Sequence, residues 1–148
     1  MNHRRRIPCR WLALLVVGMA AVAANAACPP VESDGRIIRK GDLTLAWRPL
    51  VTGEKTPKSG RIPMAKHFAL EVQLCDKDAV SAGQLQNADA TMPAHRHGMN
   101  YRPVIKPLGA GRFRVEGMMF HMAGQWELAF EVKSGNETLR LAQEVQAD

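Results

Sequence analysis

The fold is decided by Phe68-Ala69-Leu70-Glu71-Val72-Gln73-Leu74, in which apolar residues recur at every second position. Side chains alternate between the two faces of a β-strand, so this period of two predicts one buried face and one solvated face. The segment from Trp126 to Val132 alternates in the same way, with Glu127, Ala129 and Glu131 between its apolar residues. Both segments therefore predict strands of an antiparallel sheet.

Shorter patterns of the same kind predict further strands near residues 43–47, 85–92, 104–105, 112–117 and 139–141. Pro49 is expected to end the first of these strands. Gly109-Ala110-Gly111 and Ser134-Gly135-Asn136 have turn composition, and Val51 to Pro63 is expected to form a long exposed loop. About seven short strands with frequent turns predict an all-β fold, a single antiparallel immunoglobulin-like β-sandwich.

The N-terminus has the composition of a secretory leader. Four arginines, at positions 4, 5, 6 and 10, precede an apolar run from Trp11 to Ala24, and Ala24-Asn25-Ala26 fits the small-x-small cleavage rule. The sequence therefore predicts a signal peptide over residues 1–26, one domain over residues 27–148, and a periplasmic protein. Lipid attachment at Cys28 is the alternative, although the residues before it lack the usual leucine.

Removal of the leader changes the charge and the cysteine content. The whole chain carries a net charge of +6, and loss of the four leader arginines leaves +2 without a basic run that has interleaved aromatics. Nucleic-acid binding therefore has little support. Cys28 and Cys75 remain, and an even pair in an oxidising compartment predicts a disulfide. Metal binding by one or both thiols is the competing interpretation.

A second informative stretch is Met92-Pro93-Ala94-His95-Arg96-His97-Gly98-Met99, which is followed by a further cluster, Met118-Met119-Phe120-His121-Met122. Imidazole and thioether together are the ligands that suit copper, and the soft sulfur favours Cu(I). Thioethers need no deprotonation to bind, so such a site keeps its affinity at mildly acid pH.

The spacing of these residues suggests a metal clamp made of His95, His97 and Met99. In an extended segment, His95 and His97 would point to the same side, and Gly98 would let the chain turn Met99 back toward them. His121 is expected to point outward and to complete the site. Met92 is equally compatible with core packing and with ligation. The alternative is an exposed polar loop whose histidines cap backbone groups. The remaining histidine of residues 27–148, His67, is expected at the surface.

The second half of the chain resembles the YtkA-like family, which is related to the FixH-like proteins. The resemblance is carried by M-P-x-H-x-H-G-M from Met92 to Met99, G-x-G at Gly109 to Gly111, and F-H-M-x-G-x-W from Phe120 to Trp126. It implies a small extracytoplasmic β-sandwich, in a family of which some members are linked to copper handling and oxidase assembly.

The function predicted from these patterns is a non-enzymatic copper-binding or copper-delivery domain that exchanges the ion with an envelope or membrane protein. The sequence suggests no Ser/His/Asp or Cys/His nucleophile, and thioethers are poor ligands for the hard ions used in hydrolysis. The predicted cluster also lacks the thiolate of electron-transfer copper sites. The alternative function is a structural or protein-interaction module of the cell envelope without a bound metal.

Overall fold

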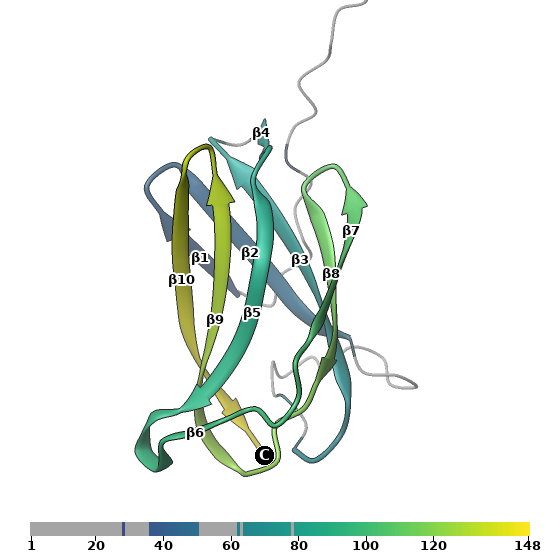
Figure 1. The fold of residues 1–148 in the computed structure, drawn as a ribbon, viewed down its shortest axis with the longest axis vertical. Coiled ribbons are helices and arrows are strands. Elements are labelled where there is room, and N and C mark those ends of the chain that lie inside the picture. Colours follow the sequence, from purple (N-terminus) through teal and green to yellow (C-terminus); the bar gives the residue numbers. More distant parts are fainter. Residues whose placement is uncertain (1–27, 29–35, 51–61, 63, 78) are drawn as a thin grey trace, which may run out of the picture.

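The computed structural model describes residues 28, 36–50, 62, 64–77 and 79–148, and they form two antiparallel sheets packed face to face (Figure 1). One sheet has the order β1-β2-β3-β8-β7, with β4 paired to β3, and the other has the order β10-β9-β5-β6. The strands are β1 (Ile37–Lys40), β2 (Leu43–Leu50), β3 (Phe68–Asp76), β4 (Ala79–Val80), β5 (Gln84–Met92), β6 (His97–Gly98), β7 (Val104–Gly109), β8 (Arg112–Met118), β9 (Gly124–Ser134) and β10 (Glu137–Ala147). Among the described residues the only helical element is the 3-10 turn η1 (Pro93–His95), and none of their helices could cross a membrane.

The connectivity confirms the predicted immunoglobulin-like sandwich. The order β2-β3-β8-β7 corresponds to strands A, B, E and D of such a domain, and β5-β9-β10 corresponds to strands C, F and G. Sequence alternation located β3, β5, β8 and β9, and the turns at Gly109–Gly111 and Ser134–Asn136 join the hairpins β7–β8 and β9–β10. The predicted leader over residues 1–26 lies outside the described residues.

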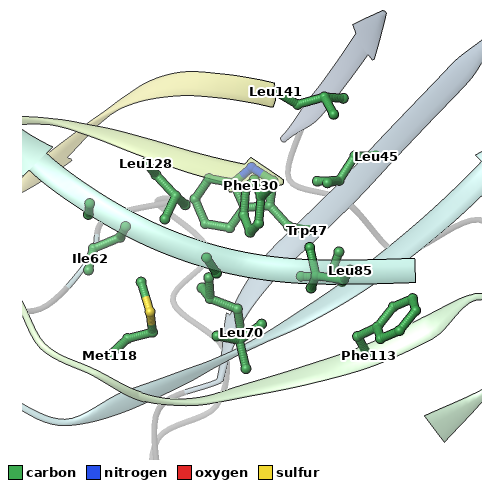
Figure 2. Packing of buried hydrophobic residues seen from close by; sticks show 14 of the residues in the cluster. Leu45, Trp47, Ile62, Leu70, Leu85, Phe113, Met118, Leu128, Phe130 and Leu141 are labelled. Atoms are coloured by element: carbon green, nitrogen blue, oxygen red, sulfur yellow. The ribbon is translucent and has the colours of Figure 1, made fainter. Parts of the chain in front are cut away.

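The hydrophobic core fills the space between the two sheets (Figure 2). Strands β2, β3, β5, β8, β9 and β10 contribute inward-facing residues, so the side chains that alternate in sequence meet in one layer. The largest fully buried side chains are Trp47, Trp126, Phe120, Phe130, Leu45, Ile62, Leu70, Leu74, Met92, Met118, Leu128 and Leu141. This core includes two methionines of the Met/His clusters, which ties the ends of β5 and β8 into the packed interior.

Strand β3 departs from the expected pattern of one wet face. Gln73, on its outer face, is only 1% exposed, and its amide nitrogen donates to the carbonyl oxygen of Ala110 at 3.0 Å. The turn that contains Ala110 packs against β3, and Leu74 N–H donates to Gly111 O at 2.8 Å. Gly111 makes this close approach possible, because a Cβ there would lie 2.7 Å from Leu74 O. The amide nitrogen of Gln73 is therefore buried with hydrogen-bonding partners, whereas its Oε1 has none among the described residues.

The expectation that Pro49 ends its strand is wrong, since β2 runs to Leu50 and Pro49 pairs with Leu70 of β3. The pairing of β2 with β1 already stops at Ala46, so the missing N–H of proline breaks no bond of that ladder. Most of the predicted loop over residues 51–63 lies outside the described residues. Ile62 is described, and it is buried and bridges to Ala147.

The predicted disulfide between Cys28 and Cys75 is present, with the two Cα atoms 5.8 Å apart. It joins the N-terminal segment to the end of β3 and closes a loop with a sequence separation of 47 residues. Such a bridge stabilises a domain mainly by restricting its unfolded chain, and by more when the loop is long.

Replacing both cysteines, as Cys28→Ser/Cys75→Ser, should lower the free energy of unfolding by about 2–4 kcal/mol through the loss of this cross-link. Urea denaturation of the protein, with and without reductant, measures the change. Reductant should destabilise the wild type and leave the double variant unaffected. A wild type that is indifferent to complete reduction would contradict a stabilising role for the bridge.

Candidate metal centre

Every histidine and every methionine of residues 27–148 lies in a loop or strand end at one end of the sandwich. Antiparallel pairing brings these segments together, because the start of β3 pairs with the end of β8 and the end of β5 pairs with the start of β9. This is the end at which β6 and the C-terminus lie (Figure 1). We call it the His/Met end, and its members are His67, His95, His97, His121, Met64, Met92, Met99, Met118, Met119 and Met122.

The first motif forms a tight reversal between β5 and β6. Pro93 opens the 3-10 turn η1, and Arg96 adopts a left-handed conformation with φ 53° and donates its N–H to Pro93 O at 3.3 Å. The chain then returns antiparallel to β5, with His97 opposite Met92. The predicted extended segment from His95 to His97 is therefore wrong, because proline and the left-handed residue impose a turn.

The two histidines nevertheless come together at the tip of this reversal. The rings of His95 and His97 stack with centroids 6.3 Å apart and an interplanar angle of 21°. Both side chains are exposed, so solvent and an approaching partner can reach them. The turn thus achieves by a different backbone route the pairing that was expected from an extended segment.

The register of β6 sets the direction of the next two side chains. Residues directly opposite each other in an antiparallel pair project to the same face of the sheet. His97 lies opposite the buried Met92, and Met99 donates its N–H to the carbonyl of buried Ala90 at 3.1 Å. His97 and Met99 are therefore on the inner side of the sheet, and the half-buried Met99 packs against the core.

His121 lies across from this reversal, on the segment that links β8 to β9. Its ring is half-buried, 6.2 Å from the ring of His97 and 5.4 Å from that of Trp126, both in edge-to-face geometry. Its Nδ1 is buried and has no hydrogen-bond partner among the described residues. An unsatisfied buried polar atom costs about 1–3 kcal/mol. The contacts that orient this ring are the two edge-to-face ones, with His97 and Trp126, and not a hydrogen bond of Nδ1.

Trp126 anchors the segment that carries His121. Its ring is fully buried and stacks on Phe120 with centroids 4.7 Å apart, and its indole N–H donates to Met122 O at 3.0 Å. The backbone on both sides of His121 is therefore fixed to the core. Met122 itself is half-buried and packs against the core cluster.

Met92 reaches toward the same segment from inside the sandwich. It is 1% exposed, and its terminal methyl group lies 3.1 Å from the position that a Cβ on Gly124 would occupy. A glycine at this position, with φ 130°, leaves room for the thioether to approach. Of the five predicted ligands, the structure thus gathers His95, His97, His121 and Met92 around one region. Met99 lies beside Ala90, further along the edge of β5.

The donor set of this region is mixed. Among the described residues no group of three or more histidine, cysteine, aspartate or glutamate side chains is placed to hold a metal ion. The ring of His97 lies near that of His95 on one side and near that of His121 on the other. The remaining candidate donors of this region are thioethers. Trp126 lies on the buried face that the alternation from Trp126 to Val132 predicts, but its contact with His121 was not predicted. The spacing from His121 to Trp126 is the only sequence signal for that contact.

Comparison with known proteins gives one structural likeness. No protein-family profile matches the chain, and no curated protein matches it by sequence. The solved structure of a copper-bound variant of FetP, from uropathogenic Escherichia coli strain F11, is similar over 76% of this chain and 94% of that chain, with a TM-score of 0.49 and 9% sequence identity. The resemblance to the YtkA-like family therefore stays a prediction from the motifs.

Replacing Trp126 by phenylalanine should lower the free energy of unfolding by about 1–2 kcal/mol, because Met122 O loses its donor, and should shift the ring-proton resonances of His121. The matched control is Trp47→Phe, which removes the indole N–H that donates to Gln143 Oε1 at 3.0 Å. Urea denaturation and proton NMR measure the two effects. Unchanged His121 resonances in Trp126→Phe would contradict the anchoring role.

Proposed function

We propose that this protein is a non-enzymatic, extracytoplasmic domain that binds a soft metal ion, with copper as its cargo. The observation that carries the proposal is the approach of His97 and His121, from different segments, to 6.2 Å between ring centroids. Metal–imidazole bonds measure about 2.0–2.1 Å, which puts the centroids of two ligating rings about 5–6 Å apart. The observed separation of 6.2 Å lies close to this range.

The neighbouring thioethers favour copper over harder ions. Met92 lies in the core beside Gly124, and Met122, which follows His121 in the chain, packs against the same core. Thioether is a ligand for Cu(I) and a poor one for hard ions. The buried, unpartnered Nδ1 of His121 also fits a ring that lacks a structural hydrogen-bonding role. His95, His97, His121 and Met92 are therefore the proposed ligands, with Met99 as a further candidate beside them.

The exposure of the site supports delivery of the ion by ligand exchange. His95 and His97 lie at the exposed tip of the reversal, whereas His121 and Met92 are partly or fully buried. A ligand of a partner protein can therefore replace the exposed imidazoles first, without unfolding the core. We propose an envelope or membrane protein as the partner that gives or receives copper.

The test is an anaerobic titration of the processed protein with Cu(I) against a chromophoric chelator, comparing wild type with His95→Ala/His97→Ala. Loss of a residue that only supports a metal ligand typically lowers metal affinity 10–100-fold. Loss of two direct ligands should therefore lower the affinity of this site for Cu(I) at least about 100-fold. Asn100→Ala is the matched control, since Asn100 is exposed in the same loop and is no proposed ligand.

Thermal unfolding of all three proteins without copper verifies that they are equally folded. Equal copper binding by wild type and the double variant would contradict the proposal and would favour a metal-free interaction module.

A further inference from the structure

One edge of the sandwich is rich in exposed cations. From Ala90 to Val115 the chain contains no aspartate or glutamate, whereas its five arginine and lysine side chains are all exposed. They are Arg96, Arg102, Lys106, Arg112 and Arg114. Four of them lie on or next to the hairpin β7–β8, in which β7 is the outermost strand of its sheet (Figure 1). We call the exposed residues from Tyr101 to Arg114 the β7 edge.

The β7 edge also exposes apolar side chains. Four large hydrophobic residues are exposed among those that the structure describes, and three of them lie here. Tyr101 is 43% exposed, Val104 is 57% exposed and Leu108 is 47% exposed. Exposed apolar side chains that gather in one place, with polar residues around them, mark an interaction surface.

Cations and apolar residues are interleaved on the outer face of this hairpin. Val104 pairs with Glu116, and Lys106 pairs with Arg114. Val115, between Arg114 and Glu116, is buried, so the paired residues project outward together. Glu116 forms ion pairs with Lys106 and Arg114, and the hydrogen bond from Lys106 lowers the pKa of its carboxyl group. The one acid of the hairpin is therefore compensated by its neighbours.

Two further cations of the β7 edge are uncompensated. Arg102 precedes β7 and Arg112 begins β8, and neither has an ion-pair partner in the part of the chain that the structure describes. Asp89 of β5 lines the same hollow as Arg102 without forming an ion pair with it. The surface thus keeps a positive charge on both sides of Val104 and Leu108.

The other sheet has the opposite charge balance. Its strands β5, β9 and β10 carry five acids and two cations, which are Asp89, Glu127, Glu131, Glu137, Glu144, Lys133 and Arg140. A protein with such an asymmetry is oriented by the field of a charged partner. An anionic partner therefore meets the β7 edge first.

The β7 edge is poorly suited to strand addition by another polypeptide. Pro107, in the middle of β7, has no N–H to donate, and Lys106 beside it carries a charge. Proline and lysine on an edge strand are features that prevent edge-to-edge pairing. A phospholipid surface requires no such pairing, since its phosphates accept hydrogen bonds from arginine and lysine and its acyl region receives apolar side chains.

We propose that the β7 edge docks the protein on an anionic lipid bilayer. The cations bind the phosphate groups, and Val104 and Leu108 between them reach the boundary of the acyl chains. Tyr101 and His97 are separated by only three residues, so docking holds the His/Met end near the membrane. The inference needs no metal ion, and it is tested independently of the proposed copper site.

The test measures the binding of residues 27–148 to sedimented lipid vesicles in the presence of a metal chelator. The described sheets, core and disulfide are all formed from Cys28 onward, and this chain lacks the apolar run from Trp11 to Ala24, which would itself bind lipid. Vesicles made of equal parts of phosphatidylcholine and phosphatidylglycerol should bind the protein. Vesicles of phosphatidylcholine alone should bind it weakly, and added salt should reduce binding to the anionic vesicles.

Arg102→Gln/Arg112→Gln should weaken binding to the anionic vesicles about 25-fold, since each cation near such a surface contributes a factor of about five. The matched control is Arg39→Gln/Lys40→Gln, which removes the same charge from β1, at the opposite edge of the same sheet. The control should bind within about twofold of wild type. Circular dichroism verifies that all variants keep their strand content.

Val104→Ser/Leu108→Ser tests the apolar contribution and should remove the binding that persists at high salt. The inference is overturned if anionic vesicles bind the protein no better than neutral ones, or if the two charge variants bind equally. Binding to soluble polyglutamate without binding to vesicles would also overturn it, and would indicate an acidic protein as the partner of the β7 edge.

Discussion

Trp47 of β2 and Phe130 of β9 meet between the two sheets with ring centroids 6.3 Å apart, and the rest of the structure depends on this packing. Both side chains are fully buried, and the inward residues of β3, β5 and β8 pack around them (Figure 2). Because the sheets are held face to face, strand ends that are distant in sequence are fixed at the same end. The His/Met end is a consequence of this arrangement.

The core also determines which side chains at that end are buried against it and which are exposed. Trp126 extends the core to the segment of His121, through its stacking on Phe120 and its hydrogen bond to Met122 O. In contrast, His95 and His97 lie on the short hairpin formed with β6 at the edge of the sheet, and both of their side chains are exposed. The candidate centre thus combines a half-buried imidazole next to the core with two exposed imidazoles. This combination suits an ion that must be held and then released.

Much of the fold could be predicted from the sequence, since period-two alternation is a direct consequence of strand geometry. The strand containing Val72 and the strand containing Phe130 were located in this way, and the disulfide between Cys28 and Cys75 followed from cysteine count and compartment. The continuation of β2 through Pro49 could not be predicted, because it depends on where the neighbouring β1 stops.

The candidate site was predictable in its residue types and less so in its geometry. The motif from Met92 to Met99 identified the donors, but the turn at Pro93 and Arg96 replaced the extended segment on which their alignment was argued. The proximity of His97 to His121 and the contact of His121 with Trp126 are tertiary, and no local pattern contains them. Local pattern identifies potential ligands, whereas the assembled sheets decide which of them meet.

The central claim is that imidazole and thioether groups at the His/Met end bind one ion together. X-ray absorption spectroscopy at the copper edge of the Cu(I)-loaded protein tests it most directly. The account predicts nitrogen scatterers at about 2.0 Å together with sulfur at about 2.3 Å, as for imidazole and sulfur ligands of similar ions. A copper shell made of nitrogen and oxygen alone, without sulfur, would contradict it.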